Sequence, residues 1–125
     1  MSRVVVIGAG LAGLTAALRL ARAGQSVTLA TKGPGGLQLS QGTIDILGYS
    51  PERVTRPLEA IASLPDEHPY ASIGADEVAA AVIWLGQQLG PELLTGDPST
   101  NLHLPTAVGA LRPTALAQPS MVAGD

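Results

Sequence analysis

The chain has 125 residues, the length of one small domain, and 46% of them are apolar whereas only 14% are charged. This composition excludes a disordered chain, and it suggests that part of the surface faces other protein. The absence of cysteine excludes disulfides and thiolate chemistry, and ten acidic against seven basic residues, with no basic block, argue against a nucleic-acid binder.

The first thirty-one residues predict a β-α-β unit. Val4–Ile7 is a continuous β-branched run, typical of a strand buried on both faces of a parallel sheet. Leu11–Ala23 is rich in alanine and leucine and is followed by Gly24, which is typical of a helix and its C-terminal cap. Ser26–Thr31 predicts the second strand, so we expect an α/β fold that begins as a Rossmann-like FAD/NAD(P)-binding unit with a right-handed crossover.

The rest of the chain predicts a partly helical region. No third parallel strand is evident after residue 31, so we expect an incomplete domain that is part of a longer protein or is completed by a partner. No targeting or membrane-spanning segment is evident. The expected elements are a long ordered loop with one helical turn over 33–50, a helix over Pro57–Ser63, a loop over Pro65–Gly74, a helix over Ala75–Leu89 and a strand pair formed by Leu102–Leu104 and Ala107–Leu111.

The glycines that follow the first strand match the pattern G-x-G-x-x-G. Gly8 permits a tight turn, Gly10 lets the backbone approach a pyrophosphate, and Gly13 lets the helix pack closely on the strand. The amides of Leu11 and Ala12 then open a helix whose positive end suits phosphate. The pattern predicts dinucleotide or flavin binding; the alternative is a glycine-rich turn without a ligand.

The end of the second strand departs from that pattern. A carboxylate that accepts the ribose hydroxyls is usual about 20 residues after the glycines, and this chain has Thr31 there. A threonine makes one weaker hydrogen bond, and the adjacent Lys32 is either a phosphate ligand or a solvated lysine.

A loop rich in glycine and serine follows at once and separates flavin from nicotinamide binding. It resembles the K-G-x-x-G-G-x-x-x-x-S-x-G pattern of flavoproteins in the fumarate reductase and succinate dehydrogenase group, and a plain flexible loop is the alternative. Its candidate cofactor-binding residues are Gly35, Gly36, Ser40, Gly42 and Thr43.

Three segments together resemble the B subunit of the anaerobic glycerol-3-phosphate dehydrogenase. They are Thr31–Leu47 (TKGPGGLQLSQGTIDIL), the HPY of His68–Tyr70 followed by Ile73-Gly74, and Leu104–Thr114 (LPTAVGALRPT). The resemblance covers nearly the whole chain in the same order, and it includes the non-acidic residue at position 31.

This resemblance implies the N-terminal portion of a flavin-dependent oxidoreductase subunit, with FAD or FMN as cofactor. It implies oxidation of glycerol 3-phosphate to dihydroxyacetone phosphate, with electrons passed to a quinone. The implied partners belong to the same complex: one is its catalytic subunit, and the other is a membrane-associated iron–sulfur subunit. The implied location is the cytoplasm. Contact with the partner subunits would hold the chain at the inner face of the cell membrane.

Four further polar residues are candidates for a functional or structural role. Arg112 is a candidate ligand of a substrate or flavin phosphate, and His68 is a candidate base or ligand that could equally cap backbone groups. We expect His103 on the outward face of a strand and Asp45 to cap its own loop, and the alternative for Asp45 is to polarise a flavin or substrate hydroxyl. No metal-ligand cluster and no Ser/His/Asp arrangement is recognisable, so the catalytic residues are not identified.

These observations divide the chain into two regions. Residues 1–42 are expected to hold the nucleotide-binding unit and flavin loop, and residues 43–125 to begin a cap or substrate region that returns toward the flavin near Gly109–Thr114. A non-catalytic accessory or electron-relay module is the main alternative, and a nicotinamide-dependent reductase domain is the other.

Overall fold

The computed structural model describes residues 2–123, and the chain folds as two compact units. The first unit extends to Gln41, and the second begins at Gly42.

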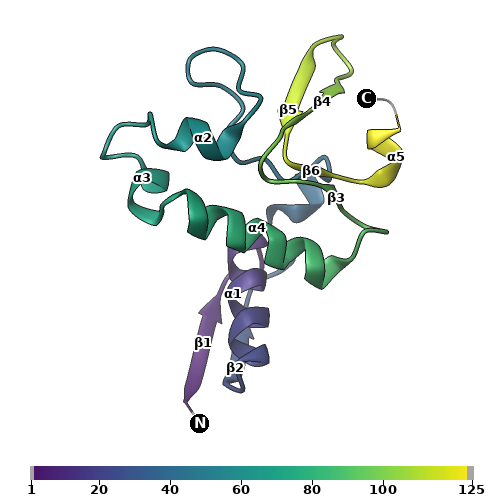
Figure 1. Ribbon diagram of the computed structural model, residues 1–125. Coiled ribbons are helices and arrows are strands. Elements are labelled where there is room, and N and C mark those ends of the chain that lie inside the picture. Colours follow the sequence, from purple (N-terminus) through teal and green to yellow (C-terminus); the bar gives the residue numbers. More distant parts are fainter. Residues whose placement is uncertain (1, 124–125) are drawn as a thin grey trace. The chain divides into compact units, whose positions relative to one another are not determined.

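The first unit is the predicted β-α-β arrangement. Strands β1 (Arg3–Ile7) and β2 (Ser26–Ala30) pair in parallel, from Arg3 opposite Ser26 to Ile7 opposite Ala30, and helix α1 (Leu11–Arg22) connects them (Figure 1). The helix ends as expected, because Gly24 has a φ of +83°, which favours glycine. The α/β fold class is therefore confirmed.

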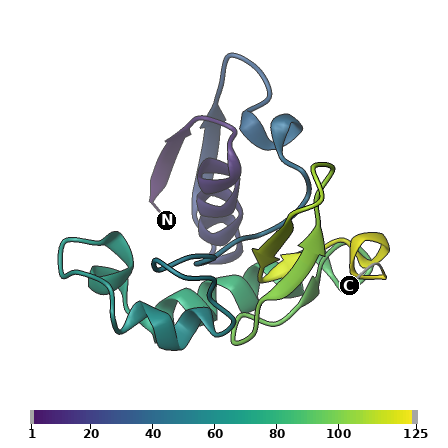
Figure 2. The same cartoon turned by 90° about the horizontal axis from the view of Figure 1, so that it is seen from above.

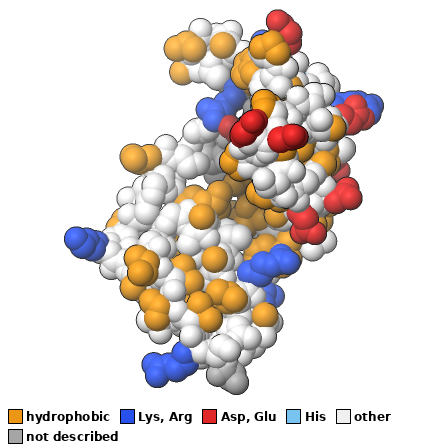
Figure 3. Space-filling model, turned by 90° about the vertical axis from the view of Figure 1, so that its left-hand side faces the viewer, with side chains coloured by type: hydrophobic (Ala, Val, Ile, Leu, Met, Phe, Trp, Pro, Cys, Tyr) orange, Lys and Arg blue, Asp and Glu red, His pale blue; other side chains and the backbone are white. Residues whose placement is uncertain are grey.

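The sheet of the first unit is two-stranded within residues 2–123, and no residue from 2 to 41 is fully buried. On β1, Val4 and Val6 are half-buried, whereas Val5 and Ile7 on the opposite face are 63% and 86% exposed. Figure 3 shows apolar side chains gathered over this unit. A segment with so little buried surface gains little stability from its own packing.

Three helices begin the second unit. They are α2 (Pro57–Ile61), α3 (Pro69–Ile73) and α4 (Ala75–Leu89), and the first two pack against the third. Helix α4 has the predicted bounds. The prediction of a loop over 65–74 was wrong, because His68 caps a helical turn there.

Short antiparallel strand pairs and a last helical turn complete the second unit (Figure 2). The predicted strand over 107–111 was wrong: residues 106–110 form the turn, with Gly109 at a φ of +82°, and the strand begins at Leu111. The pairs are β3 (Thr95–Gly96) with β6 (Leu116–Ala117) and β4 (Leu102–Pro105) with β5 (Leu111–Thr114), and the helix is α5 (Pro119–Val122).

The hydrophobic core of the second unit joins segments that are far apart in sequence. It brings the 44–47 segment, α2, α4 and β6 into one apolar cluster. Its buried members are Ile46, Ile61, Val78, Val82, Ala115 and Leu116.

Charge is divided between the units. The first unit has four basic residues and no acidic residue, a net charge of +4, whereas the second has three basic and ten acidic residues, a net charge of −7. Within residues 2–123, we find no helix with the length and apolar character needed to cross a membrane.

Candidate functional site

The loop between β1 and α1 has the turn at Gly8 and the close approach at Gly13 that the glycine pattern predicted. Gly8 has a φ of +103°, and its amide donates to the carbonyl oxygen of Ala30 at 2.9 Å, which ties the loop to the end of β2. A Cβ atom on Gly13 would lie 2.0 Å from the carbonyl oxygen of Gly8. Glycine is therefore required at position 13 for the close approach of helix and loop.

Gly10 differs from Gly8 in its ordinary φ and from Gly13 in the open space beside its α-carbon. A Cβ atom there would meet no heavy atom within 4 Å, and its φ is −79°. Gly10 caps α1 without a side chain, and its carbonyl oxygen accepts from the Leu14 amide at 3.0 Å. The amides of Leu11, Ala12 and Gly13 thus have no acceptor within the helix, which is the arrangement that binds phosphate at a helix N-terminus.

The glycine-rich loop after β2 lies directly on this first loop. A Cβ atom on Gly35 would lie 2.4 Å from the carbonyl of Ala9 and from the amide nitrogen of Gly10. Gly36 opens the short 3₁₀ helix η1 (Gly36–Leu39). The structure therefore brings together two of the segments predicted to bind the cofactor, although they are about 25 residues apart.

Gly35 is the residue whose importance the sequence showed least clearly. The Gly35-Gly36 pair was a visible signal, but only the three-dimensional approach to Ala9 and Gly10 shows which glycine of the pair leaves no room for a side chain.

Thr31 and Lys32 lie just beyond β2 and are exposed. The Thr31 hydroxyl donates to the Gly33 carbonyl oxygen at 2.5 Å and accepts from the Gly33 amide at 3.2 Å. The hydroxyl thus closes a local turn.

The remaining predicted loop residues fall around the boundary between the units. Ser40 follows η1 in the first unit, whereas Gly42 and Thr43 begin the second. Gly42 has a φ of +87°, and a Cβ atom on it would lie 3.0 Å from the side chain of Gln118. Within the second unit, Gly42 therefore needs the conformational freedom of glycine.

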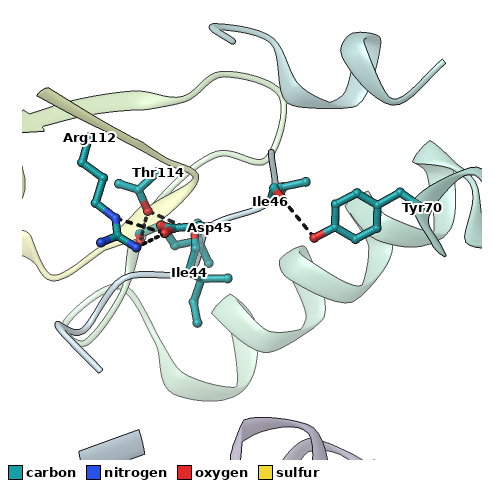
Figure 4. Close-up of polar contacts among 7 residues, drawn as sticks. Ile44, Asp45, Ile46, Tyr70, Arg112 and Thr114 are labelled. Carbon is teal, nitrogen blue, oxygen red and sulfur yellow. Dashed lines mark hydrogen bonds and ion pairs between the residues drawn. The ribbon is translucent and has the colours of Figure 1, made fainter. Parts of the chain in front are cut away.

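The segment after Thr43 is held from two sides (Figure 4). The Ile44 amide donates to the Leu116 carbonyl oxygen at 2.8 Å, and the Ile44 carbonyl oxygen accepts from the Thr114 hydroxyl at 3.1 Å. The Tyr70 hydroxyl donates to the Ile46 carbonyl oxygen at 3.1 Å. Bonds to β5, β6 and α3 thus fix the backbone on both sides of Asp45.

Asp45 forms an ion pair with Arg112 on β5. The Arg112 Nε donates to Asp45 Oδ2 at 3.1 Å, and Nη2 donates to the same oxygen. The expectation that Asp45 caps its own loop was therefore wrong, because its carboxylate reaches a strand 67 residues away. The Arg112 side chain is 44% exposed, so the pair leaves a cationic group in contact with solvent.

The two histidines belong to the secondary structure of the second unit: His68 caps α3 and His103 lies on β4. The Nδ1 of His68 accepts from the Tyr70 amide at 3.0 Å, so the capping interpretation of His68 is confirmed. His103 does not face outward as expected: it is half-buried on β4, and its Nε2 is shielded from solvent.

Two further features lie apart from the predicted residues. The Ser99 hydroxyl and amide donate to Asp97 and hold the pKa of this carboxyl below its usual value. A cavity of about 290 Å³ lies between the C-terminal half of α4 and the 94–98 segment, and apolar side chains such as Val82, Leu94 and Leu116 line it. Within residues 2–123, His, Asp and Glu form no group suited to a metal ion.

Comparison with known proteins gives close relatives that are much longer. A probable anaerobic glycerol-3-phosphate dehydrogenase B subunit from Halobacterium salinarum is 39% identical over 98% of this chain. The anaerobic glycerol-3-phosphate dehydrogenase B subunit of Vibrio vulnificus is 39% identical over 93%, and that of Aliivibrio fischeri is 35% identical over 92%. The chain spans only 27–29% of the length of these relatives, at their N-terminal part.

No solved structure matches the chain. A family model described as "FAD binding domain" matches residues 3–125, which is nearly all of the chain and includes both units. The flavin prediction is thereby supported at the level of the family. The chain belongs to the FAD binding domain family and is homologous to the B subunit of the anaerobic glycerol-3-phosphate dehydrogenase.

Proposed function

We propose that this chain supplies the nucleotide-binding part of a flavin-dependent subunit that oxidises glycerol 3-phosphate to dihydroxyacetone phosphate and passes the electrons toward a quinone. The observation that carries the proposal is the contact between Gly35 and the Ala9-Gly10 backbone in a chain of the FAD binding domain family. The substrate comes from the names of the relatives, each the B subunit of a glycerol-3-phosphate dehydrogenase.

The residues of the first unit fit a flavin nucleotide. Gly10 leaves open space beside the backbone, and the amides of Leu11, Ala12 and Gly13 are the donors at that end of the helix. The net charge of +4 on this unit attracts phosphate groups, because no carboxylate there opposes them. Bound flavin would supply the two-electron redox chemistry, and the loops would orient it.

Thr31, Lys32, Gly36, Ser40, Gly42 and Thr43 complete the proposed cofactor contacts. Lys32 is an exposed cation beside the turn that Thr31 closes, so it suits a phosphate better than a ribose diol. The proposed regions are residues 1–42 for the flavin and 43–125 for the start of the cap or substrate region.

Arg112 is the proposed ligand of the substrate phosphate. Its guanidinium is held by Asp45, whose own backbone is fixed by the bonds of Ile44 and Ile46, and it remains partly exposed. A planar cation with a fixed orientation suits a phosphate because two N–H groups can bind one phosphate together. His68 is left out of the proposed site, because its Nδ1 is engaged in the cap of α3.

The names of the relatives describe one subunit of an enzyme, which implies a complex. We therefore propose two partners from that complex, of which one is the catalytic subunit, and the other is a membrane-associated iron–sulfur subunit. The proposed location of the assembly is the cytoplasmic face of the membrane.

A non-catalytic accessory or electron-relay role is the second candidate. The turn at Thr31 favours it, since that hydroxyl is bonded to Gly33 and no carboxylate follows β2 to bind an adenosine ribose. In the accessory role the glycine loop would be a scaffold without cofactor, whereas an electron relay would still need a bound redox group.

The experiment that separates the two roles is a visible absorption spectrum of the purified chain, with and without added FAD or FMN, followed by mass spectrometry of any released cofactor. The proposal predicts a flavin spectrum, and the mass identifies the nucleotide. A folded protein that stays colourless with both nucleotides would contradict cofactor binding by this chain and support the scaffold role.

A further inference from the structure

The three sequence segments that resemble the B subunit meet in one hydrogen-bond network of the second unit (Figure 4). The first segment contributes Asp45, the second contributes Tyr70, and the third contributes Arg112 and Thr114. The proposed function uses the ion pair of Asp45 and Arg112, but it gives Tyr70 no role. The network therefore raises the question of what the Tyr70 hydroxyl does for the ion pair.

Asp45 lies between two isoleucines that anchor the chain in the core. Ile46 is a buried member of the apolar cluster, and Ile44 packs against that cluster. The carboxylate between them bonds Arg112, with Nε at 3.1 Å from Oδ2. The position of this carboxylate therefore depends on how firmly the backbone is held at the two isoleucines.

The backbone is held differently on the two sides of Asp45. The Ile44 carbonyl oxygen accepts from the Thr114 hydroxyl at 3.1 Å and from the amides of the next two residues at 3.0 and 3.1 Å. On the other side, the Ile46 carbonyl oxygen accepts from the Tyr70 hydroxyl at 3.1 Å. Loss of the Tyr70 hydroxyl would thus loosen one side of Asp45 and leave the other side bonded to the strand segment.

Tyr70 is itself fixed by its neighbours. Its backbone amide donates to His68 Nδ1 at 3.0 Å, and the two rings pack at an angle of 47° with their centroids 5.2 Å apart. The Tyr70 ring also packs against the apolar cluster. The hydroxyl is therefore presented to the Ile46 carbonyl oxygen by a side chain with little freedom to move.

We propose that Tyr70 is a positioning residue for the substrate phosphate. Its hydroxyl holds Ile46, so that the Asp45 carboxylate keeps the Arg112 guanidinium in one orientation before the phosphate arrives. A cation that is oriented in advance loses less conformational freedom on binding, which raises its affinity for the anion. The inference rests on the proposed role of Arg112, and Tyr70 acts only through Ile46 and Asp45.

The test uses the variant Tyr70→Phe of the full chain, which removes the hydroxyl and keeps the ring and the amide that His68 accepts from. Nuclear magnetic resonance gives the exchange rate of the Arg112 Nε hydrogen with water and, on titration, the dissociation constant of glycerol 3-phosphate. We expect exchange to be faster and binding weaker, each by about two- to tenfold, which corresponds to the loss of one hydrogen bond. Asp45→Asn provides the reference for the exchange rate, because it removes the ion pair directly.

The other tyrosine of the chain provides the matched control. Tyr49 also belongs to the second unit and is 56% exposed, so Tyr49→Phe removes the same atom outside the network and should change neither quantity. Amide exchange of α4 is measured in the same samples. A purely structural role of Tyr70 would speed α4 exchange and leave both the Arg112 hydrogen and the affinity for glycerol 3-phosphate unchanged.

The outcomes distinguish this inference from the proposed function. If glycerol 3-phosphate leaves the Arg112 signal of the unaltered chain unchanged, the proposed role of Arg112 is wrong and the inference fails with it. If that signal responds but Tyr70→Phe binds as tightly as the unaltered chain, the role of Arg112 stands and Tyr70 does not position it. Equal effects of Tyr70→Phe and Tyr49→Phe would overturn the inference as well.

Discussion

At the scale of single residues, the three glycines of one loop differ in what the fold requires of them. Gly8 needs a positive φ, Gly13 has no room for a Cβ atom, and Gly10 has ample room and an ordinary φ. Folding alone therefore explains Gly8 and Gly13, whereas the fold does not require glycine at position 10, where we propose that a ligand approaches the backbone.

This difference gives a paired prediction for alanine substitutions. Gly13→Ala should destabilise the first unit by about 1–3 kcal/mol, because its Cβ atom collides with backbone that must move. Gly10→Ala should leave stability unchanged within about 0.5 kcal/mol and weaken flavin binding about tenfold or more, because the methyl group fills the space proposed for the phosphates.

Denaturant unfolding monitored by hydrogen exchange of β1 and β2 gives the stability, and flavin fluorescence titration gives the affinity. Gly33→Ala is the matched control, since a Cβ atom there also meets open space and Gly33 lies outside both the first loop and the proposed cofactor contacts. Unchanged flavin affinity in Gly10→Ala would contradict the proposed approach of the cofactor to this backbone.

At the scale of elements, Asn101 joins a loop to the strands. Its buried side-chain amide donates to the carbonyl oxygens of Leu47 at 2.9 Å and Val54 at 2.7 Å, and its own backbone amide donates to the Thr55 carbonyl oxygen at 2.8 Å. One side chain thereby closes the 47–55 loop at its base.

Removal of the Asn101 side chain should destabilise the second unit. Asn101→Ala leaves two carbonyl oxygens without their donor and should lower the free energy of unfolding of the second unit by about 1–3 kcal/mol. Ser99→Ala, in the neighbouring exposed turn, is the control: it removes the hydroxyl bond to Asp97 and should destabilise the second unit by about 1 kcal/mol or less. Chemical denaturation of both variants measures the difference, and equal stabilities would show that Asn101 does not hold the loop.

Local sequence signals predicted the elements that depend on nearby residues. Helix α4 has acidic residues in its first turn and glycines at both ends, and its bounds were predicted to the residue. The β-α-β unit follows from an apolar run, a glycine pattern and a segment of good helix formers. The glycine loop of the candidate site was predictable for the same reason.

The elements that were missed depend on contacts distant in sequence. Helix α3 is a single turn that exists because His68 caps it and the Tyr70 hydroxyl reaches Ile46. Strand β5 contains Pro113, which a two-stranded ladder tolerates because a proline can occupy an edge position there. The Asp45–Arg112 pair spans 67 residues, and the spacing of two charged residues does not reveal such a pairing.

At the scale of the whole molecule, the two units differ in how they are stabilised. Every residue of the buried hydrophobic cluster belongs to the second unit, whereas no described residue of the first unit is fully buried. Most of the stability gained from apolar burial therefore belongs to residues 42–125.

Hydrogen exchange of the chain alone should show this difference directly. Amides of α4 around Val78 and Val82 should exchange about 100-fold more slowly than those of β1 and β2, because the helix opens only when the core is disrupted. Flavin bound as proposed should slow exchange in the first unit and, within the second unit, only beside the proposed contacts Gly42 and Thr43. Equal protection of both units without ligand would contradict this division of stability.

The division of charge has a consequence for handling the protein in solution. The sequence has an isoelectric point of about 5.2, the pH at which its net charge vanishes. Lysine and arginine are protonated there, so the first unit keeps its positive charge, while the ionised carboxylates of the second unit balance it. Near that pH, unlike units of neighbouring molecules attract one another at low ionic strength, and added salt should therefore dissolve the protein instead of precipitating it.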